Sequence, residues 1–394
     1  MGGMVFQTPQ CDALEHRVLD LIDDARHQLR FRVAEPRRWI GSLRRMTFAR
    51  AVQGSNSIEG YNASLDDVLA AVEGEPTLDA DSETQLALAG YRDAMTYVLQ
   101  VAQDPTPPSV DEGLLKALHF MMIKHDLQKN PGRWRPGTVY VRNDATGEIV
   151  YEGPGFEQLT ALIDATIREL EDSDAPVLVR AAMAHLNLVM VHPFSDGNGR
   201  MARALQTLVL AREQIVAPVF SSIEEYLGRN TQAYYDVLAE VGQGSWNPGN
   251  DARPWIRFCL TAHYRQAMTH LRRIEEAEQL WAACAELALG HGLPERAASG
   301  LYDAAHGVRL RNAFYRKLVQ GTLSEQISEL TASRDLKAMV DAGLLDPVGE
   351  RRGRHYVARE LVIDMRRRIR QDRPARDTTD PFDRASEQLQ LNLG

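Results

Sequence analysis

Apolar residues recur at helical spacing along most of the chain, and this pattern predicts a mainly α-helical protein. The segment PTPP at 105–108 interrupts the pattern as a linker or turn. The predicted helices cover residues 12–32, 40–54, 65–73, 83–103, 109–127, 156–172, 177–191, 199–213, 223–242 and 251–289.

Residues 131–155, PGRWRPGTVYVRNDATGEIVYEGPG, have a different pattern. Val, Tyr and Ile alternate with polar residues there. Turn-forming pairs stand at Asn143-Asp144 and Thr146-Gly147. Alternation broken by a short turn is typical of a β-hairpin, which this segment therefore predicts.

Beyond residue 295 the predicted elements become short. Helices are expected at 311–319, 324–330 and 331–345, and two strands within 343–358. This order predicts a small winged helix-turn-helix domain over 295–370. Its strands are joined by a Gly- and Arg-rich turn that carries Arg351, Arg352 and Arg354. The polar residues 371–394 are expected to form a flexible tail.

Charge leaves two hypotheses open for this C-terminal part. Residues 301–370 hold 14 Lys and Arg against 9 Asp and Glu, whereas the whole chain carries −9. A basic winged helix suits a DNA backbone, but winged helices also dock proteins. The acidic chain as a whole disfavours non-specific nucleic-acid binding.

Composition places the chain among globular proteins. It has 394 residues, 44% hydrophobic and 25% charged, which favours two or three domains. No apolar run reaches the roughly 20 residues of a membrane span, and no secretion signal is visible. Cys11, Cys259 and Cys284 form no disulfide or metal-binding pattern. We therefore expect a cytoplasmic protein without a membrane partner.

Candidate chemistry concentrates in HPFSDGNGRMAR at 192–203, between two predicted apolar helices. A glycine inside a helix costs about 1 kcal/mol relative to alanine, so Gly197-Asn198-Gly199 is expected to be a non-helical turn. Backbone N–H groups in such a turn, just before a helix, bind anions. Arg200 and Arg203 would share one face of that helix and supply guanidinium groups for phosphate oxygens.

Two further residues of this segment suit phosphate chemistry. Asp196 would lie at the rim of an anion site, where a bridging Mg²⁺ would offset its negative charge. His192 is the group that titrates near neutral pH and could act as a base. Together these residues indicate a nucleoside triphosphate site. The alternative is a plain turn after a helix that stops at His192-Pro193.

The segment matches the signature HPFx[D/E]GNGRxxR of the Fic family at every position, and the resemblance extends over about residues 40–265. It implies a Fic-type helical core with a hairpin flap. It also implies transfer of AMP from ATP to a hydroxyl group of a target protein. Some family members catalyse other phosphotransfers or the reverse hydrolysis, so a de-adenylylase or another phosphotransferase remains an alternative. A DNA-binding regulator with the Fic core as its sensor is another.

By its position in the signature, each residue acquires an expected role. His192 would deprotonate the target hydroxyl, and Asp196 would hold Mg²⁺ between the α- and β-phosphates. Phe194 would anchor the loop in the core. The phosphates would be bound by the following residues: Gly197, Asn198 and Gly199 at the α/β-phosphates, Arg200 on the β side and Arg203 at the γ-phosphate.

Two neighbouring segments also resemble parts of the family. The hairpin, as a flap over 138–153, would dock the target along Ile149, Val150 and Tyr151; otherwise it only covers the core. Tyr234 and Tyr235 match a Tyr pair beside the adenine. They are consecutive, so at most one stacks on the base. Gly242 replaces an Asn that many relatives carry, which leaves the adenine contacts open.

The segment SNSIEG at 55–60 matches the family's inhibitory pattern [S/T]xxxE[G/N]. Ser55 would brace the helix, Gly60 would end it, and Glu59 would reach Arg203, so the enzyme would be autoinhibited. The alternative is a helix boundary formed by a capping box and a glycine stop.

His185 lies seven residues before His192, but a core histidine with satisfied hydrogen bonds is preferred there over a metal ligand.

The expected domains are an N-terminal helical region (1–108) with the inhibitory motif, the Fic core (109–290), the winged helix (295–370) and the tail (371–394). The expected cofactors are ATP and Mg²⁺. Besides the target protein, self-modification and a homodimer are partner hypotheses.

Overall fold

The computed structural model describes residues 4–75, 77, 79–142, 146–214, 217–350 and 353–391. Contacts divide the chain into two units. The first comprises Met1–Arg30, Ala49–Met268 and Thr379–Gly394, and the second comprises Phe31–Phe48 and Thr269–Thr378.

Helices predominate in the described residues, as the apolar pattern predicts. Up to Gly290 they are α1 (Ala13–Ala34), α2 (Ile40–Ile58), α3 (Leu65–Val72), α4 (Ser82–Val101), α5 (Glu112–Ile123), α6 (Leu159–Asp172), α7 (Val177–Val191), α8 (Asn198–Arg212), α9 (Glu224–Arg229), α10 (Thr231–Gly242) and α11 (Arg253–Gly290). Three short 3-10 helices are η1 (Leu127–Lys129), η2 (Phe156–Gln158) and η3 (Pro218–Phe220).

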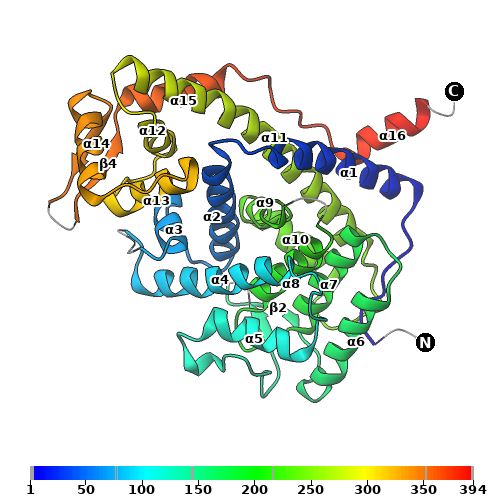
Figure 1. The fold of residues 1–394 in the computed structure, drawn as a ribbon. Helices are drawn as coiled ribbons and strands as arrows, with labels where there is room; N and C mark the ends of the chain where they lie inside the picture. The colour runs from blue at the N-terminus through cyan, green and yellow to red at the C-terminus, as the bar shows by residue number, and fades with distance from the viewer. Residues whose placement is uncertain are drawn as a thin grey trace. The chain divides into compact units, whose positions relative to one another are not determined.

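Helices α7 and α8 form the centre of the first unit, where they pack against each other (Figure 1). Nearly every side chain of both helices is buried. A helix that is buried on all sides needs neighbours all round, and α4, α5 and α6 supply them. The loop 192–197 between α7 and α8 is therefore held at both ends by the best-packed part of the molecule.

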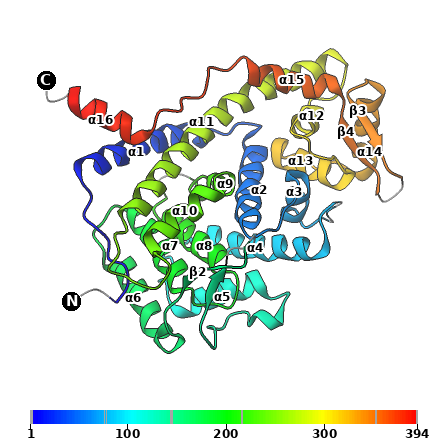
Figure 2. The same cartoon turned by 180° about the vertical axis from the view of Figure 1, so that it is seen from behind.

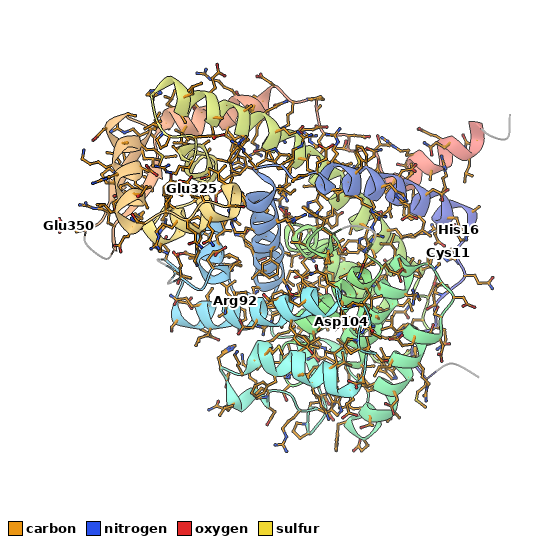
Figure 3. All side chains as sticks on the ribbon, in the orientation of Figure 1. Cys11, His16, Arg92, Asp104, Glu325 and Glu350 are labelled. Atoms are coloured by element: carbon orange, nitrogen blue, oxygen red, sulfur yellow. The ribbon has the colours of Figure 1, made fainter. Side chains whose placement is uncertain are left out.

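Helix ends around this centre are fixed by capping side chains. Asp81 accepts a hydrogen bond from the N–H of Thr84 at the start of α4, and Asp111 accepts from Leu114 at the start of α5. The labelled Arg92 on α4 donates to the main-chain oxygen of Ala71 near the end of α3 (Figure 3).

The predicted hairpin is present, with strands β1 (Tyr140–Arg142) and β2 (Ile149–Glu152). They pair antiparallel, with Val141 opposite Tyr151. On the other edge of β2, Glu152 pairs with Ser245, and β2 also contacts α10 (Figure 2). The predicted turn pair Asn143-Asp144 lies outside the described residues, whereas Gly147 has a φ of +73°.

The second unit contains short elements in the order helix, helix, helix, strand, strand, helix. They are α12 (Ala297–Ala305), α13 (Asn312–Leu323), α14 (Glu329–Asp341), β3 (Leu345–Val348), β4 (His355–Ala358) and α15 (Glu360–Gln371). Strands β3 and β4 pair antiparallel, and Leu310 adds a bridge to Tyr356. The assignment as a winged helix-turn-helix stays a prediction. Arg354 is exposed, while Arg351 and Arg352 lie outside the described residues.

One predicted helix of this unit is wrong. Residues 324–328 form no helix, because Ser324 adopts a left-handed conformation at the end of α13 and Ser328 caps α14, which begins at Glu329. The first of the three helices is instead α12, which the sequence pattern did not single out. Both serines are ordinary helix-end residues, and this is the signal that the prediction overlooked.

Two other segments differ from their predicted form. The helix predicted over 223–242 is two helices, α9 and α10, separated at Asn230. Within the predicted flexible tail, the structure places α16 (Pro381–Leu391), where Ala385 is buried and Phe382 faces the guanidinium of Arg257. Two apolar side chains and a cation suffice to hold this short helix. Among the described residues, no helix combines the length and the apolar character needed to cross a membrane.

Candidate active site

His192 ends α7 in a left-handed conformation, with a φ of 50°. Its Nδ1 lies 3.1 Å from the main-chain oxygen of Val189. That oxygen can only accept, so Nδ1 carries the proton and Nε2 keeps its lone pair. Burial lowers the pKa of His192, which keeps the ring neutral at pH 7. The side chain is therefore in the form that a general base needs.

The loop after His192 is closed by Asn198. Its side chain accepts a hydrogen bond from the N–H of Phe194 and donates to the oxygen of the same residue, both at 2.9 Å. Phe194 is fully buried, as expected of an anchor, and stacks on His119 with ring centroids 3.8 Å apart. The Asn198 side chain thus shapes the loop. The N–H of Gly197 donates to Oδ1 of Asp196 at 2.6 Å, so the N–H groups at 198–199 are the ones that can face an anion.

The prediction that Gly197-Asn198-Gly199 is entirely non-helical is wrong. Gly197 is left-handed, with a φ of 76°, but α8 begins at Asn198. Glycine is tolerated in a first helical turn because the N–H groups there have no helical partners in any case. Those free N–H groups, at the positive end of the helix dipole, are the predicted anion-binding feature.

Arg200 and Arg203 are both buried, each 1% exposed. Nε and Nη1 of Arg200 and Nη1 of Arg203 have no hydrogen-bond partner among the described residues. A buried cationic donor without a partner is costly, so such groups indicate a missing anion. Three donors beside the N-terminus of α8 fit the oxygens of a polyphosphate.

The structure brings Arg203 together with the segment 55–60. Nε of Arg203 donates to Oγ of Ser55 at 2.7 Å, and Nη2 lies 2.6 Å from Oε1 of Glu59. Burial opposes the charge of Arg203, but Glu59, together with Tyr234 and Tyr91, offsets this effect and raises the pKa of the guanidinium. A Cβ on Gly199 would lie 2.4 Å from Oε1 of Glu59, so only glycine leaves room for this carboxylate.

Buried polar groups lie behind Ser55. The hydroxyl of Tyr91, whose pKa Ser55 influences, donates to Glu224 at 2.6 Å. The backbone of α2 comes close to α9 at the same level, since a Cβ on Gly54 would lie 2.4 Å from the main-chain oxygen of Glu224. The C-terminal half of α2 is therefore part of the core and positions Ser55 and Glu59 firmly. Gly60, with a φ of +85°, follows its end as expected.

Asp196 is partly exposed, and its Oδ2 lies 2.8 Å from Nζ of Lys129. In the described ranges, no group of three or more His, Cys, Asp and Glu side chains is placed to hold a metal ion. One carboxylate is nevertheless what Mg²⁺ commonly takes from a protein when phosphates and water complete its coordination. The residues present thus fit Mg²⁺ best together with a nucleotide, whose phosphate oxygens add to the single carboxylate.

The consecutive residues Tyr234 and Tyr235 point in different directions, one into the core and one towards solvent. Tyr234 is buried and its hydroxyl lies 3.0 Å from Nε2 of His185. His185 also contacts Gln206, so it is a core histidine with both nitrogens paired. Tyr235 is 46% exposed and donates to the main-chain oxygen of Ile58. At Gly242 a Cβ would lie 3.3 Å from Tyr151 and 3.4 Å from Met190. These two side chains fill the space into which an Asn side chain would start.

In the flap, Ile149 and Val150 are exposed, 50% and 43%, while Tyr151 is buried. The hydroxyl of Tyr151 donates to the oxygen of Met190 on α7 at 2.8 Å. Tyr151 therefore ties the flap to the core, and in target docking its contribution would come from the main chain.

Sequence reasoning missed two residues that hold the loop. Arg135 is buried; its Nε donates to the oxygen of His192 and its Nη2 to Pro154 beyond the flap. His119 bridges two segments: Nδ1 accepts from Gly132, and Nε2 donates to the main-chain oxygen of Asp196. The available signal was the position of Arg135 in GRWRP, between Gly132 and Pro136. Glycine and proline constrain the backbone there, and an arginine that only faces solvent does not need such a constraint.

A family model described as the Fic/DOC family matches residues 109–210. The chain is similar to the protein adenylyltransferase Fic of Nematostella vectensis, with 26% identity over 254 residues, 64% of this chain and 55% of the relative. It is also similar to the protein adenylyltransferase fic-1 of Caenorhabditis elegans, with 28% identity, covering 64% of this chain and 46% of the relative. The chain thus spans about half the length of these curated relatives.

Solved structures share the fold. A Fic family protein from Desulfovibrio desulfuricans G20 aligns with a TM-score of 0.57 and 20% identity, covering 90% of this chain and 98% of that one. Fic-1 from C. elegans aligns with a TM-score of 0.51 and 22% identity, covering 66% of this chain and 72% of that one. The likeness agrees with the mainly helical fold and its hairpin.

Proposed function

Because the chain is a member of the Fic family, with its Fic/DOC domain at residues 109–210, we propose that the protein transfers AMP from ATP to a hydroxyl side chain of a target protein. His192, the N-terminus of α8, Arg200 and Arg203 are the residues that carry the reaction. Relatives named protein adenylyltransferase support this assignment.

The observation that carries the proposal is the set of unpaired, buried guanidinium donors of Arg200 and Arg203. They lie beside the free N–H groups of α8, where phosphate oxygens would satisfy both. His192 stands at the other end of the same loop with its Nε2 lone pair free, as the hydrogen bond of Nδ1 requires.

In the proposed reaction, the oxygen of the target hydroxyl attacks the α-phosphorus of ATP. The bond from that phosphorus to the bridging oxygen breaks and pyrophosphate leaves, while the hydroxyl proton moves to Nε2 of His192. Arg200 and Arg203 would hold the β- and γ-phosphates in line. Asp196 would hold Mg²⁺, which when bound supplies positive charge against the leaving pyrophosphate.

Autoinhibition by Glu59 is part of the proposal. Its Oε1 accepts a hydrogen bond from Nη2 of Arg203 at 2.6 Å. The γ-phosphate would need the same guanidinium, so carboxylate and phosphate compete for one group. With Glu59 in place, the phosphates would be bent away from the geometry that in-line attack requires.

The target would dock along the flap. Ile149 and Val150 are exposed on β2, and an extended target segment could add main-chain hydrogen bonds to this strand. The strand edge at Glu152 is already paired with Ser245, so docking is limited to the residues before it.

The experiment is to incubate the protein with ATP labelled at the α- or the γ-phosphate. The proposal expects α-label, and no γ-label, on the protein itself or on an added target. Transfer of γ-label instead would identify another phosphotransferase. Release of AMP from an already modified protein, without transfer, would identify a de-adenylylase.

A further inference from the structure

Lys129 forms an ion pair with the carboxylate that is the proposed metal ligand. Its Nζ lies 2.8 Å from Oδ2 of Asp196 and 3.9 Å from Oδ2 of Asp126. The ammonium therefore stands between two carboxylates. The side chains of Lys129 and Asp196 are both 30% exposed, so the pair is half enclosed rather than free on the surface.

The backbone on both sides of this pair is fixed by one histidine ring. Lys129 ends the short helix η1, and the following turn reaches Gly132, whose N–H donates to Nδ1 of His119. Nε2 of the same ring lies 3.0 Å from the main-chain oxygen of Asp196. With the ring itself buried against Phe194, the two partners of the ion pair are held at a set separation.

A third side chain lies close to the lysine. Tyr61 interacts electrostatically with Lys129, and its ring lies under the guanidinium of Arg200 at 5.2 Å. Tyr61 directly follows the segment 55–60. The residues after α2 thus contact the phosphate-binding arginines and the lysine on Asp196 together.

We propose that the ammonium of Lys129 occupies the position on Asp196 that a divalent cation takes in the nucleotide complex, so that lysine and cation compete for one carboxylate. This rests on the proposed function of Asp196 as a metal ligand. Mg²⁺ binds carboxylate oxygen at about 2.0–2.1 Å, so an ion on Oδ2 of Asp196 would stand within a few ångströms of the ammonium that lies 2.8 Å from the same oxygen. The two cations also repel each other in a partly enclosed site.

Competition has a measurable consequence without nucleotide. Removing the lysine charge leaves Asp196 with the more distant Arg200, whose Nη2 lies 3.8 Å from Oδ2, and takes away the cation that stands between Asp126 and Asp196. The nucleotide-free protein should therefore gain affinity for divalent cations. We expect Lys129→Met to bind Mn²⁺ at least about tenfold more tightly than the parent protein, as measured from the electron paramagnetic resonance signal of free Mn²⁺. Lys129→Arg keeps the charge and should bind Mn²⁺ as the parent does.

Two further variants locate the effect. Lys124→Met removes a lysine that pairs with Asp93 at 2.9 Å, away from the loop, and should leave Mn²⁺ binding unchanged. Adding Asp196→Asn to Lys129→Met should abolish the gain. Parent-like Mn²⁺ binding by Lys129→Met would overturn the inference, and so would a gain that survives Asp196→Asn.

The same proteins separate this inference from the proposed function. If Lys129→Met gains Mn²⁺ affinity through Asp196 but no variant transfers α-label from ATP, the competition stands and the proposed function fails. If the parent transfers α-label but Lys129→Met binds Mn²⁺ no more tightly, the proposed function stands and Lys129 is only a structural ion pair.

Discussion

Oε1 of Glu59 lies 2.6 Å from Nη2 of Arg203, although the two residues are 144 positions apart in the chain. The contact joins the end of α2 to the second turn of α8. Arg203 is buried, so its charge is matched either by this carboxylate or by another anion. The exchange of one anion for another at Arg203 is the basis of the first prediction.

Glu59→Gly should increase AMP transfer to the protein itself or to a target by at least about tenfold, or roughly 1.4 kcal/mol on the barrier. The change frees Nη2 of Arg203 without adding a catalytic group. The measurement is the initial rate of α-label incorporation at saturating ATP. Glu59→Gly combined with His192→Ala should be inactive, because release of inhibition does not replace the base. Equal rates for Glu59→Gly and the parent would mean that residues 55–60 are only a helix end.

His192→Ala should lower the transfer rate by about 10²–10⁴ while ATP binding changes less than a few-fold, because a positioned base acts on the reaction and not on the phosphates. Rates come from α-label incorporation in the Glu59→Gly background, and binding from calorimetric titration. Transfer close to that of the background would refute the assignment of His192 as the base.

Asp196→Asn should lose Mg²⁺-dependent transfer and keep its stability. Its ion pair with Lys129 is partly exposed, and such pairs contribute on the order of 0–1 kcal/mol. Activity is measured over a Mg²⁺ titration, and stability by denaturant unfolding. A variant that responds to Mg²⁺ as the parent does would show that Asp196 is not the ligand.

Stability should fall as the pH drops from about 6.5 to about 4. Burial lowers the pKa of His119 to about 4 and that of His185 and His263 to about 3. In this window the unfolded chain binds protons that the folded protein does not. The contribution of these histidines to the free energy of unfolding is therefore complete above the ordinary histidine pKa and is lost as the pH falls below it. Shifts of this size correspond to about 3–5 kcal/mol per group.

The measurement is denaturant unfolding at several pH values. His119→Gln should reduce the slope of unfolding free energy against pH by up to about 1.4 kcal/mol per pH unit, which is the contribution of one proton. His291 is exposed, so His291→Gln serves as the control and should leave the slope unchanged. An unchanged slope for His119→Gln would contradict the prediction.

Gly54→Ala should destabilise the protein by several kcal/mol, because the new Cβ would lie 2.4 Å from the backbone oxygen of Glu224. Gly41 is the matched control on the same helix, where the nearest atom to a Cβ is 3.7 Å away. Gly41→Ala should be neutral or stabilising by up to about 1 kcal/mol. Thermal unfolding of the two variants compares them directly, and equal melting temperatures would show that α2 can move away from α9.

Much of the fold followed from the sequence because the helices carry regular apolar patterns. The proximity of His192, Asp196, Arg200 and Arg203 in the candidate site was predictable, because all four belong to one contiguous motif. The residues that reach this motif from other segments were not predictable in the same way. The contact of Glu59 with Arg203 was predicted by resemblance to a family pattern, since nothing local in residues 55–60 indicates a partner so distant.

The remaining site residues depend on tertiary packing. Lys129 and His119 lie in segments without any motif, and they reach Asp196 because α5 packs against α4 and α8. Arg135 bonds main-chain oxygens of three different segments, and such partners leave no trace in residue type. The helix predicted over 324–330 failed for the opposite reason: local caps at two serines outweighed a weak helical pattern.

Gly199 has a consequence for genetics. A methyl group there would meet the carboxylate of Glu59 at 2.4 Å and the end of Arg203 at 3.0 Å. In the proposed complex the γ-phosphate takes the place of this carboxylate, so the same methyl group would also stand in the way of the nucleotide. A random screen for unrestrained variants should therefore return replacements of Glu59 but none of Gly199, although a change at either position would break the same ion pair.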